Sequence, residues 1–454
     1  MSEISMWLPP GAKTIIRKLG MYGFDAYVVG GCVRDGLLGN KPHDWDICTN
    51  AKPVEVLKCF SENRVIETGL KHGTVTIVLD DGQYEVTTFR IDGTYSDNRH
   101  PDKVTFTSDL REDLSRRDFT INAMAYGPGG LVDPFGGVED LQNSVIRCVG
   151  NPDERFAEDA LRILRAMRFS STYGFRIDEK TAKSIHDNKD KLNNIAVERV
   201  QSELCKMLLG KRVLDVLLEF SDIMATIIPE FEPCIGFDQH NRYHEYTVYD
   251  HIAHAVANYK GNDLSVKLAL LLHDIGKPQC YTEDQNGGHF HGHAVPSRDI
   301  AETVMNRMHF DNKTKNEVVE LVLYHDAVIE PNARTVKRWL NKVGENRFEQ
   351  LLKIRMADIL AHTKGTQQSR IDRCVRLGDV LVEVLQSEQC FQMKDLAISG
   401  KDILSLGVPQ GRIIGDVLRH ILDHVINGDI LNELGVQMVE ASTYLAEHGN
   451  ERTV

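Results

Sequence analysis

Hydrophobic and polar positions alternate with a period of two in the first part of the chain and follow a helical period in the rest. Short β-rich runs predict a strand at 24–31 and a hairpin of 72–79 with 83–91 around an Asp-Asp-Gly turn. From about Glu154 onward, the apolar spacing is that of helices, and strong strand candidates disappear. The pattern predicts an α+β chain with a mixed-sheet head followed by helical domains.

The length of the chain predicts several domains, because 454 residues are too many for one hydrophobic core. We place a head at residues 1–145, a helical neck at 146–235, a third domain at 236–370 and a helical tail at 371–454.

Composition limits the location and the partners of the protein. The longest apolar runs are far too short to cross a bilayer, and the first residues lack the basic and apolar regions of a signal peptide. The nine cysteines form no CxxC pair, which favours reduced thiols and a cytoplasmic location. A net charge of −13 argues against nucleic acid as a partner, so a nucleic-acid function needs specific motifs in its support.

Two aspartates lie one residue apart in the segment HDWDICT. If this segment is a strand, Asp44 and Asp46 project from one face, and Trp45 and Ile47 project from the other. Two like charges at this distance need a counter-charge, and Mg²⁺ binds carboxylate oxygens together with substrate phosphates. An exposed edge strand with alternating polar residues would give the same pattern.

Glycines precede the two aspartates in the segment VVGGCVRDGLLG. Gly30 and Gly31 let the backbone approach a ligand, and a helix that starts near Val33 directs free N–H groups toward it. Arg34 adds a donor, so a triphosphate fits beside the metal. Glu85, on the following hairpin, is a candidate third carboxylate, although a solvated strand residue is the alternative.

Four motifs in order, GGCVRDGLLG…HDWDICT, EDLSRRDFTINAMAY, DPFGGVEDL and ERFAEDALRILRAMRF, resemble the class II tRNA nucleotidyltransferase and bacterial poly(A) polymerase family. The resemblance implies a polymerase-β-like head in which Asp44 and Asp46 bind Mg²⁺ and Glu85 is the third catalytic carboxylate. In the family pattern, the contacts to the triphosphate and the ribose fall on Arg116, Arg117, Asp118 and Asn122.

The same resemblance makes Asp159 and Arg162 an amino-acid template for the incoming base. They are three apart on a predicted helix and share a face, where an ordinary ion pair is the alternative. Cytosine and adenine both present an amine beside a ring-nitrogen acceptor, so a carboxylate and a guanidinium suit them and reject uracil and guanine. Arg165 and Arg168 orient this pair or contact the substrate.

A long polar loop is predicted at residues 90–114, before the RRD motif. In the family, a flexible loop at this place is associated with the addition of adenosine, so its presence favours a protein that adds A.

A second series of motifs, which includes LALLLHDIGKP, resembles the HD phosphohydrolase superfamily. The resemblance implies one divalent metal on His251, His273, Asp274 and Asp358, with His293 and His325 as ligands of a possible second. Mixed imidazole and carboxylate ligands suit Mn, Fe, Co or Ni better than Mg. Many relatives keep this domain only as a scaffold, but the complete ligand set favours a phosphatase or 2′,3′-cyclic phosphodiesterase.

The leading interpretation is a CCA-adding enzyme that acts on the 3′ end and acceptor arm of tRNA with CTP and ATP, with no membrane and no obligate protein partner. The closest alternative is a poly(A) polymerase or an A-adding enzyme on the same fold, although the chain ends without a basic run. The second alternative is an HD-domain phosphohydrolase whose head only binds nucleotide or RNA.

Overall fold

The structure is a computed structural model that describes residues 5–67, 69–93, 104–285, 287–387 and 390–448. The chain divides into two compact units. The first comprises Met1–Glu232 with Arg307–His309, and the second comprises Pro233–Asn306 with Phe310–Val454.

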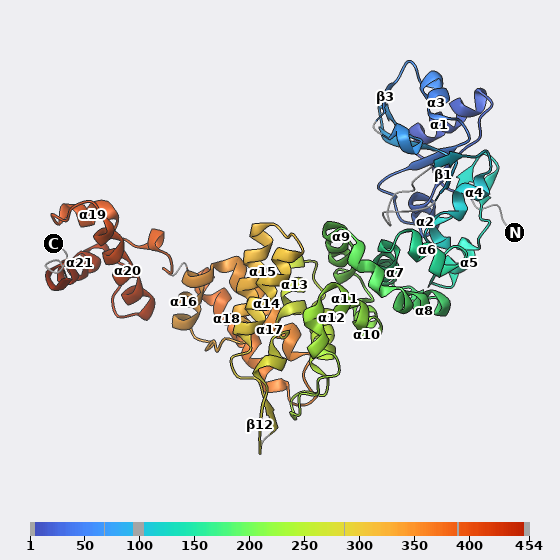
Figure 1. Cartoon of the computed structure of the whole chain (residues 1–454). Coiled ribbons are helices and arrows are strands. Elements are labelled where there is room, and N and C mark those ends of the chain that lie inside the picture. Colours follow the sequence, from blue (N-terminus) through green and yellow to red (C-terminus); the bar gives the residue numbers. More distant parts are fainter. Residues whose placement is uncertain (1–4, 68, 94–103, 286, 388–389, 449–454) are drawn as a thin grey trace. The chain divides into compact units, whose positions relative to one another are not determined.

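A seven-stranded mixed sheet forms the head of the first unit (Figure 1). In spatial order its strands are β3 (Arg64–Ile66), β4 (Thr74–Leu79), β5 (Gly82–Thr88), β2 (Asp46–Thr49), β1 (Ala26–Val29), β8 (Ala125–Gly127) and β9 (Gly130–Val132). The neighbours β2 and β5 are parallel, and the other neighbouring pairs are antiparallel. The predicted hairpin of β4 and β5 is confirmed.

The register of the central strands separates a buried face from a polar one. Val28 of β1 lies opposite Ile47 of β2, which lies opposite Val86 of β5, and all three side chains are buried. Helices α1 (Pro10–Met21) and α3 (Pro53–Cys59) pack against strands of the sheet. Because side chains alternate along a strand, the residues that precede this buried row face the other way.

The segment predicted as one loop at 90–114 contains regular structure at both ends, so that prediction is wrong there. Strand β6 (Arg90–Asp92) pairs antiparallel with β7 (Val104–Phe106), and helix α4 (Leu110–Ser115) follows. Asp109 caps α4, because its side chain accepts a hydrogen bond from the backbone N–H of Arg111 at 2.8 Å. The middle of the predicted loop, 94–103, lies outside the described residues.

Helices make up most of the rest of the first unit. They are α2 (Gly31–Leu37), α5 (Gly137–Gln142), α6 (Pro152–Glu158), α7 (Leu161–Tyr173), α8 (Glu179–Asp187), α9 (Val197–Leu208), α10 (Val213–Glu219) and α11 (Ser221–Ile227). The short strands β10 (Val145–Ile146) and β11 (Arg176–Ile177) form a parallel pair that the sequence did not predict. Helix α7 packs against α9 and α10.

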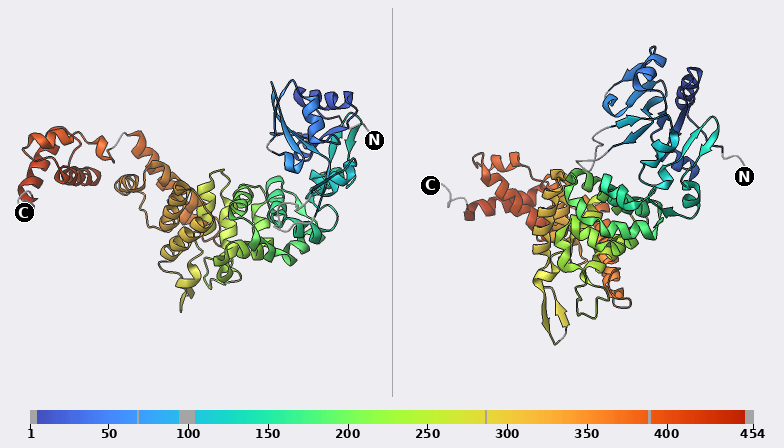
Figure 2. Two further views of the ribbon diagram at one scale, coloured as in Figure 1. Left: turned by 45° about the horizontal axis from the view of Figure 1, so that its top comes forward. Right: turned by 45° about the vertical axis from the view of Figure 1, so that its right-hand side comes forward.

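In the described part of the second unit, the strands form one hairpin, β12 (Thr282–Asp284) with β13 (Gly287–His289), which Figure 2 shows projecting from the helices. Its helices are α12 (Val248–Asn258), α13 (Leu264–Leu272), α14 (Ala294–Arg307), α15 (Asn312–Tyr324), α16 (Ala333–Val343), α17 (Glu345–Ile359), α18 (Gln368–Gln386), α19 (Gly400–Ser405), α20 (Arg412–Asn427) and α21 (Leu434–His448). Ser265–Leu272 of α13 are all buried, so this helix lies at the centre of its neighbours. The predicted α+β class, a sheet followed by helices, is confirmed.

The cysteines and the apolar helices bear on the expected thiol state and on membranes. None of the nine cysteines forms a disulfide. Among the described residues, no helix combines the length and the apolar character that crossing a bilayer requires.

Candidate functional sites

Three carboxylates meet on the polar face of the head sheet. Asp46 of β2 lies directly opposite Glu85 of the parallel strand β5, and Asp44 precedes Asp46 by two residues. All three are exposed, whereas Trp45 and Ile47 are buried, so the predicted alternation is confirmed, although β2 begins only at Asp46. The sequence therefore brings the predicted trio to one place.

The electrostatics of Asp46 reflect this crowding. Desolvation by the surrounding protein raises the pKa of Asp46, Glu85 and Asp44 raise it further, and the positive charge of Arg117 opposes them. In three groups of side chains among the described residues, the potential ligand atoms all lie within 4.8 Å of one another. Asp44, Asp46 and Glu85 are not one of these groups. The trio is thus a loose cluster of negative charge that a cation would draw together.

Gly30 closes the turn before α2, which begins at Gly31 rather than near Val33. Its φ of 81° is in the left-handed region, and a Cβ on Gly30 would lie 2.6 Å from Nη1 of Arg117. Glycine at this position therefore allows Arg117 to lie against the turn, beside Asp46.

Arg34, predicted as a phosphate donor, is buried and bonded within the protein. Its Nη1 donates to Oδ1 of Asn122 at 2.6 Å, and its Nε and Nη2 donate to Asp35 at 2.9 and 3.0 Å. Its guanidinium lies over the ring of Tyr173. Arg34 thus helps to position the side chain of Asn122.

Asp113 fixes both arginines of the RRD motif. Arg116 donates from Nε and Nη2 to Oδ1 of Asp113 at 3.0 and 2.8 Å, and Nη2 of Arg117 lies 3.8 Å from Oδ2. Asp113 is fully buried, whereas about a fifth of each arginine side chain is exposed. The sequence analysis missed Asp113, which lies one helical turn before Arg116.

Asp118, the third residue of the motif, is held on both carboxylate oxygens. Oδ2 accepts hydrogen bonds from Nε and Nη2 of Arg165 at 2.9 and 2.6 Å, and Oδ1 accepts one from Asn122 at 2.9 Å. Burial alone would raise its pKa, but Arg165 and the hydrogen bond from Asn122 hold the pKa of Asp118 well below its usual range. A ribose hydroxyl that bound Asp118 would have to share the carboxylate with Arg165 and Asn122.

Asp159 and Arg162 do not share a helix, so that part of the prediction is wrong. Helix α6 ends at Glu158, and Asp159 is extended, with φ −143° and ψ 102°. Its Oδ1 accepts a hydrogen bond from the backbone N–H of Leu161 at 3.0 Å, which begins α7. Aspartate competes with the helix for backbone hydrogen bonds in this way, and a helical period cannot reveal it.

Each member of the predicted template has another partner. Asp159 pairs with Arg199 at 2.9 Å. Arg162 donates to Oε2 of Glu158 at 2.6 Å and to the backbone carbonyl of Arg116 at 2.9 Å.

Helix α9 supplies the residues that hold this region together. Nε of Arg168 lies 2.5 Å from Oε2 of the buried Glu203, and Nη1 of Arg165 lies 4.0 Å from its Oε1. The sequence analysis missed Arg199 and Glu203. Their spacing of four residues on an amphipathic helix is the signal that would have found them.

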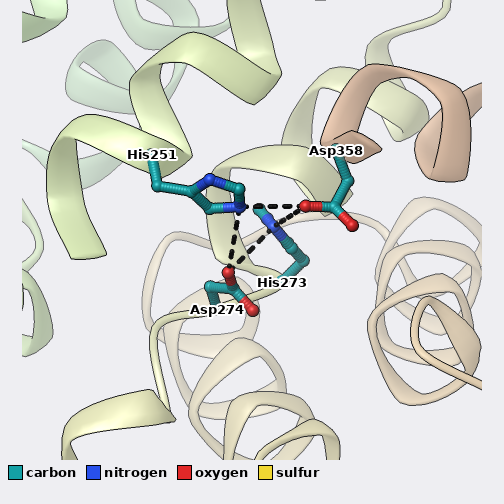
Figure 3. Close-up of side chains that lie close together, drawn as sticks. All are labelled: His251, His273, Asp274 and Asp358. Atoms are coloured by element: carbon teal, nitrogen blue, oxygen red, sulfur yellow. Dashed lines mark hydrogen bonds and ion pairs between the residues drawn. The ribbon is translucent and has the colours of Figure 1, made fainter. Parts of the chain in front are cut away.

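Four predicted metal ligands converge in the second unit (Figure 3). Nε2 of His251, on α12, lies 2.9 Å from Oδ1 of Asp358, on α17, and 3.3 Å from Oδ2 of Asp274. Nε2 of His273 lies 3.2 Å from Oδ2 of Asp274 and 3.6 Å from Oδ1 of Asp358. The two ring nitrogens and two carboxylates thus surround one point.

His293 and His325 form a second group with Asp274. Their Nε2 atoms lie 3.1 and 3.6 Å from Oδ1 of Asp274, whereas Oδ2 faces His251 and His273. The carboxylate of Asp274 therefore lies between both groups, as a ligand shared by two ions would. Burial alone would raise the pKa of Asp274, but His273 and Lys277 hold it well below its usual range.

In the histidines of both groups, the ring nitrogen that faces away from the carboxylates, Nδ1, fixes the orientation of the ring. In each of the four, Nδ1 faces a backbone carbonyl: Ala361 for His251 at 3.3 Å, Leu270 for His273 at 2.7 Å, Phe290 for His293 at 2.8 Å and Val322 for His325 at 2.6 Å. Nδ1 then carries the proton and Nε2 presents a lone pair inward, which is the arrangement typical of metal-ligating histidine. The donor set thus fits a divalent transition metal.

A cavity of about 500 Å³ opens beside these ligands. Its wall includes Asp274, Asp358 and four cationic side chains, those of Lys277, Arg355, Arg370 and Arg373. Nζ of Lys277 lies 2.7 Å from Oδ2 of Asp274. A cationic wall around metal ligands suits a phosphate-bearing molecule.

Comparison with known proteins finds three family models that match successive parts of the chain. The family model described as a Poly A polymerase head domain matches residues 26–147, the probable RNA and SrmB-binding site of polymerase A matches 174–235, and the HD domain matches 242–382. The curated CCA-adding enzyme of Ligilactobacillus salivarius is 33% identical over 441 residues, which cover 96% of each chain. The chain belongs to the CCA-adding enzyme family.

Other members of the CCA-adding enzyme family match more strongly over shorter segments. The enzyme of Enterococcus faecalis is 52% identical over 200 residues, which are 44% of this chain and 49% of that enzyme. In several such relatives, the matched segment spans about half of the relative's length. The resemblance predicted from the motifs is confirmed, whereas the domain boundaries at 145, 235 and 370 and the roles of the site residues stay predictions.

Solved structures of CCA-adding enzymes share the fold. The Bacillus stearothermophilus enzyme in complex with CTP is 28% identical, with a TM-score of 0.70 over 98% of this chain and 99% of that chain. The Thermotoga maritima enzyme complexed with tRNA-CCA, which is 22% identical, has a TM-score of 0.61 over 96% of each chain.

The Asp118–Arg165 pair predicts a measurable effect on stability. We expect Asp118→Asn to lower the free energy of unfolding of the first unit by about 2–3 kcal/mol at pH 7, because Arg165 loses its charged partner. The folded pKa of Asp118 is depressed, so this stabilisation is present above the unfolded pKa of about 4 and is lost as the pH falls toward the folded value. Urea unfolding from pH 7 to pH 3 measures both effects.

The matched control is Asp190→Asn, which changes an exposed carboxylate of the same unit. It should alter the unfolding free energy by less than about 0.5 kcal/mol. Equal stability of Asp118→Asn and the wild type at pH 7, or a difference that grows as the pH falls, would contradict the role given to this pair.

Proposed function

We propose that the protein is a CCA-adding enzyme, which transfers CMP and AMP from CTP and ATP to the 3′ end of tRNA without a nucleic-acid template and releases pyrophosphate. The carboxylate trio Asp44, Asp46 and Glu85, next to the Gly30 turn and Arg117, is the observation that carries the proposal. Membership of the family along almost the whole chain supports it.

In this proposal, Asp44 and Asp46 hold Mg²⁺, and Glu85 completes the ligand set near the attacking 3′ hydroxyl. Bound Mg²⁺ would neutralise the carboxylates and stabilise the charge on the attacking and leaving oxygens. Arg116 and Arg117 would hold the triphosphate. Asp113 supports this role, because it holds both guanidiniums while part of each stays accessible, and Arg117 also lies beside the Gly30 turn.

Base selection is proposed for Asp159 and Arg162. The carboxylate would accept a hydrogen bond from the exocyclic amine of cytosine or adenine, and the guanidinium would donate one to the adjacent ring nitrogen. A base would then compete with Arg199 for Asp159 and with Glu158 for Arg162. In this interpretation, Arg165 and Arg168 position the pair through Asp118 and Glu203.

A tRNA transcript that lacks its terminal CCA tests this function. With Mg²⁺, we expect two additions with CTP alone, a third when ATP is added, and then a stop. Asp46→Asn should lower the rate at least about a thousandfold because a metal ligand is lost. The exposed Asp80→Asn, in the turn between β4 and β5, serves as the control and should retain activity.

Single-nucleotide resolution of the products separates the alternatives. A growing ladder with ATP alone would identify a poly(A) polymerase, and one addition of A only to tRNA that ends in CC would identify an A-adding enzyme. No extension, or extension that persists in Asp46→Asn, would contradict a catalytic head and would leave the HD domain as the candidate enzyme.

We further propose that the HD domain hydrolyses phosphomonoesters or 2′,3′-cyclic phosphates with a bound Mn, Co, Ni or Fe ion. The cationic cavity beside the complete ligand set favours this second function over a scaffold. The bound metal would supply an activated water for attack on phosphorus. Lys277 and Arg355 line the cavity, where they would bind the phosphate oxygens.

Hydrolysis of p-nitrophenyl phosphate and 2′,3′-cyclic AMP tests the second function. We expect chelation to abolish it, one of the four metals to restore it, and Asp274→Asn to lower it at least about a hundredfold. Asp46→Asn is the matched control and should keep full hydrolysis. Equal hydrolysis by Asp274→Asn and the wild type, or none with any of the four metals, would contradict the proposal.

A further inference from the structure

The last two helices of the chain, α20 and α21, pack together with little buried surface from α21. Gln437 and Ala441 are the buried residues of α21, whereas α20 contributes Val417, Ile421 and three others to the apolar cluster of the tail. Val439 of α21 is 68% exposed. Met438, Tyr444 and Leu445 of α21 pack against the same cluster but are only partly buried, so a further contact with α20 would strengthen the attachment of the helix.

Such a contact is present in a group of two histidines and one glutamate. His420 and His424 are four residues apart on α20, so they share a face, and their ring centroids are 4.4 Å apart. Nε2 of His420 lies 2.7 Å from Oε1 of Glu440, on α21. One potential ligand atom from each of the three lies within 4.8 Å of the others.

The surroundings orient these side chains. Nδ1 of His424 lies 3.5 Å from Oδ2 of Asp429, a carboxylate placed as an outer partner that fixes the ring of a ligating histidine. The ring of Tyr444 lies 4.6 Å from that of His420 and covers one side of it. His420 and Glu440 are about one-quarter exposed, so an ion from solvent can reach the site.

We propose that His420, His424 and Glu440 bind one divalent transition-metal ion, such as Zn²⁺, Co²⁺ or Ni²⁺, which links α21 to α20. Two imidazoles and one carboxylate suit these ions and leave a fourth position of a tetrahedron for water. Metal bonds of about 2.0–2.2 Å set neighbouring ligand atoms about 3.3 Å apart. The His420–Glu440 pair therefore opens by roughly half an ångström, within reach of side-chain rotation.

This site is separate from both proposed catalytic centres, and its function is structural: the ion stabilises the tail. The test uses the full chain in excess Mg²⁺, which occupies sites made only of oxygen ligands. Co²⁺ is then added stepwise, and its visible absorption and the number of ions bound per chain are measured. We expect His424→Ala to bind one Co²⁺ fewer than the wild type, and Glu440→Gln to bind that ion at least about tenfold more weakly.

The matched control is His448→Ala, which changes a histidine on α21 that stacks on Tyr444 but lies outside the group of three. It should bind as many Co²⁺ ions as the wild type. Hydrogen exchange of 434–448 should slow on addition of Co²⁺ in the wild type and in this control, but not in His424→Ala.

Glu440→Gln gives an independent result if His424→Ala does not fold, because the amide keeps the size of the side chain. Circular dichroism checks both variants. Equal Co²⁺ binding by the wild type and the folded variants, with unchanged exchange of 434–448, would overturn the proposal.

Discussion

The parallel pairing of β2 with β5 is the constraint on which the head depends, because it sets Asp46 opposite Glu85. The same register that buries Ile47 and Val86 leaves these carboxylates on the polar face, so the apolar core and the negative cluster cannot be separated. Like charges at this distance raise the free energy of the metal-free protein, and Arg117 relieves it only in part. The head thus favours a bound cation through its sheet register.

A buried carboxylate has the same central place in the second unit. Asp274 faces His251 and His273 with one oxygen and His293 and His325 with the other. The two centres differ in donor type. Oxygen ligands in the head suit Mg²⁺ and phosphate transfer, whereas imidazole ligands in the HD domain suit transition metals. The two proposed centres would therefore not compete for the same ion.

Short-range patterns made much of this arrangement predictable. Alternation in HDWDICT predicted that Asp44 and Asp46 are exposed while Trp45 and Ile47 are buried, and motif order predicted the HD-domain residues that converge as expected. Contacts between distant segments were not predictable. Asp113 and Glu203 are carboxylates whose partners are set by packing, and the helix break at Asp159 depends on a local side-chain hydrogen bond. The sequence thus predicted the residues proposed to carry the chemistry better than those that position them.

Titration of Asp46 by carbon-13 NMR, with and without Mg²⁺, tests most directly whether the sheet register creates a cation site. Without metal, the pKa of Asp46 should lie above the ordinary aspartate value and should fall in Glu85→Gln, because one repelling charge is removed. Saturating Mg²⁺ should bring it below that value. An ordinary pKa that responds neither to Glu85→Gln nor to Mg²⁺ would contradict the account.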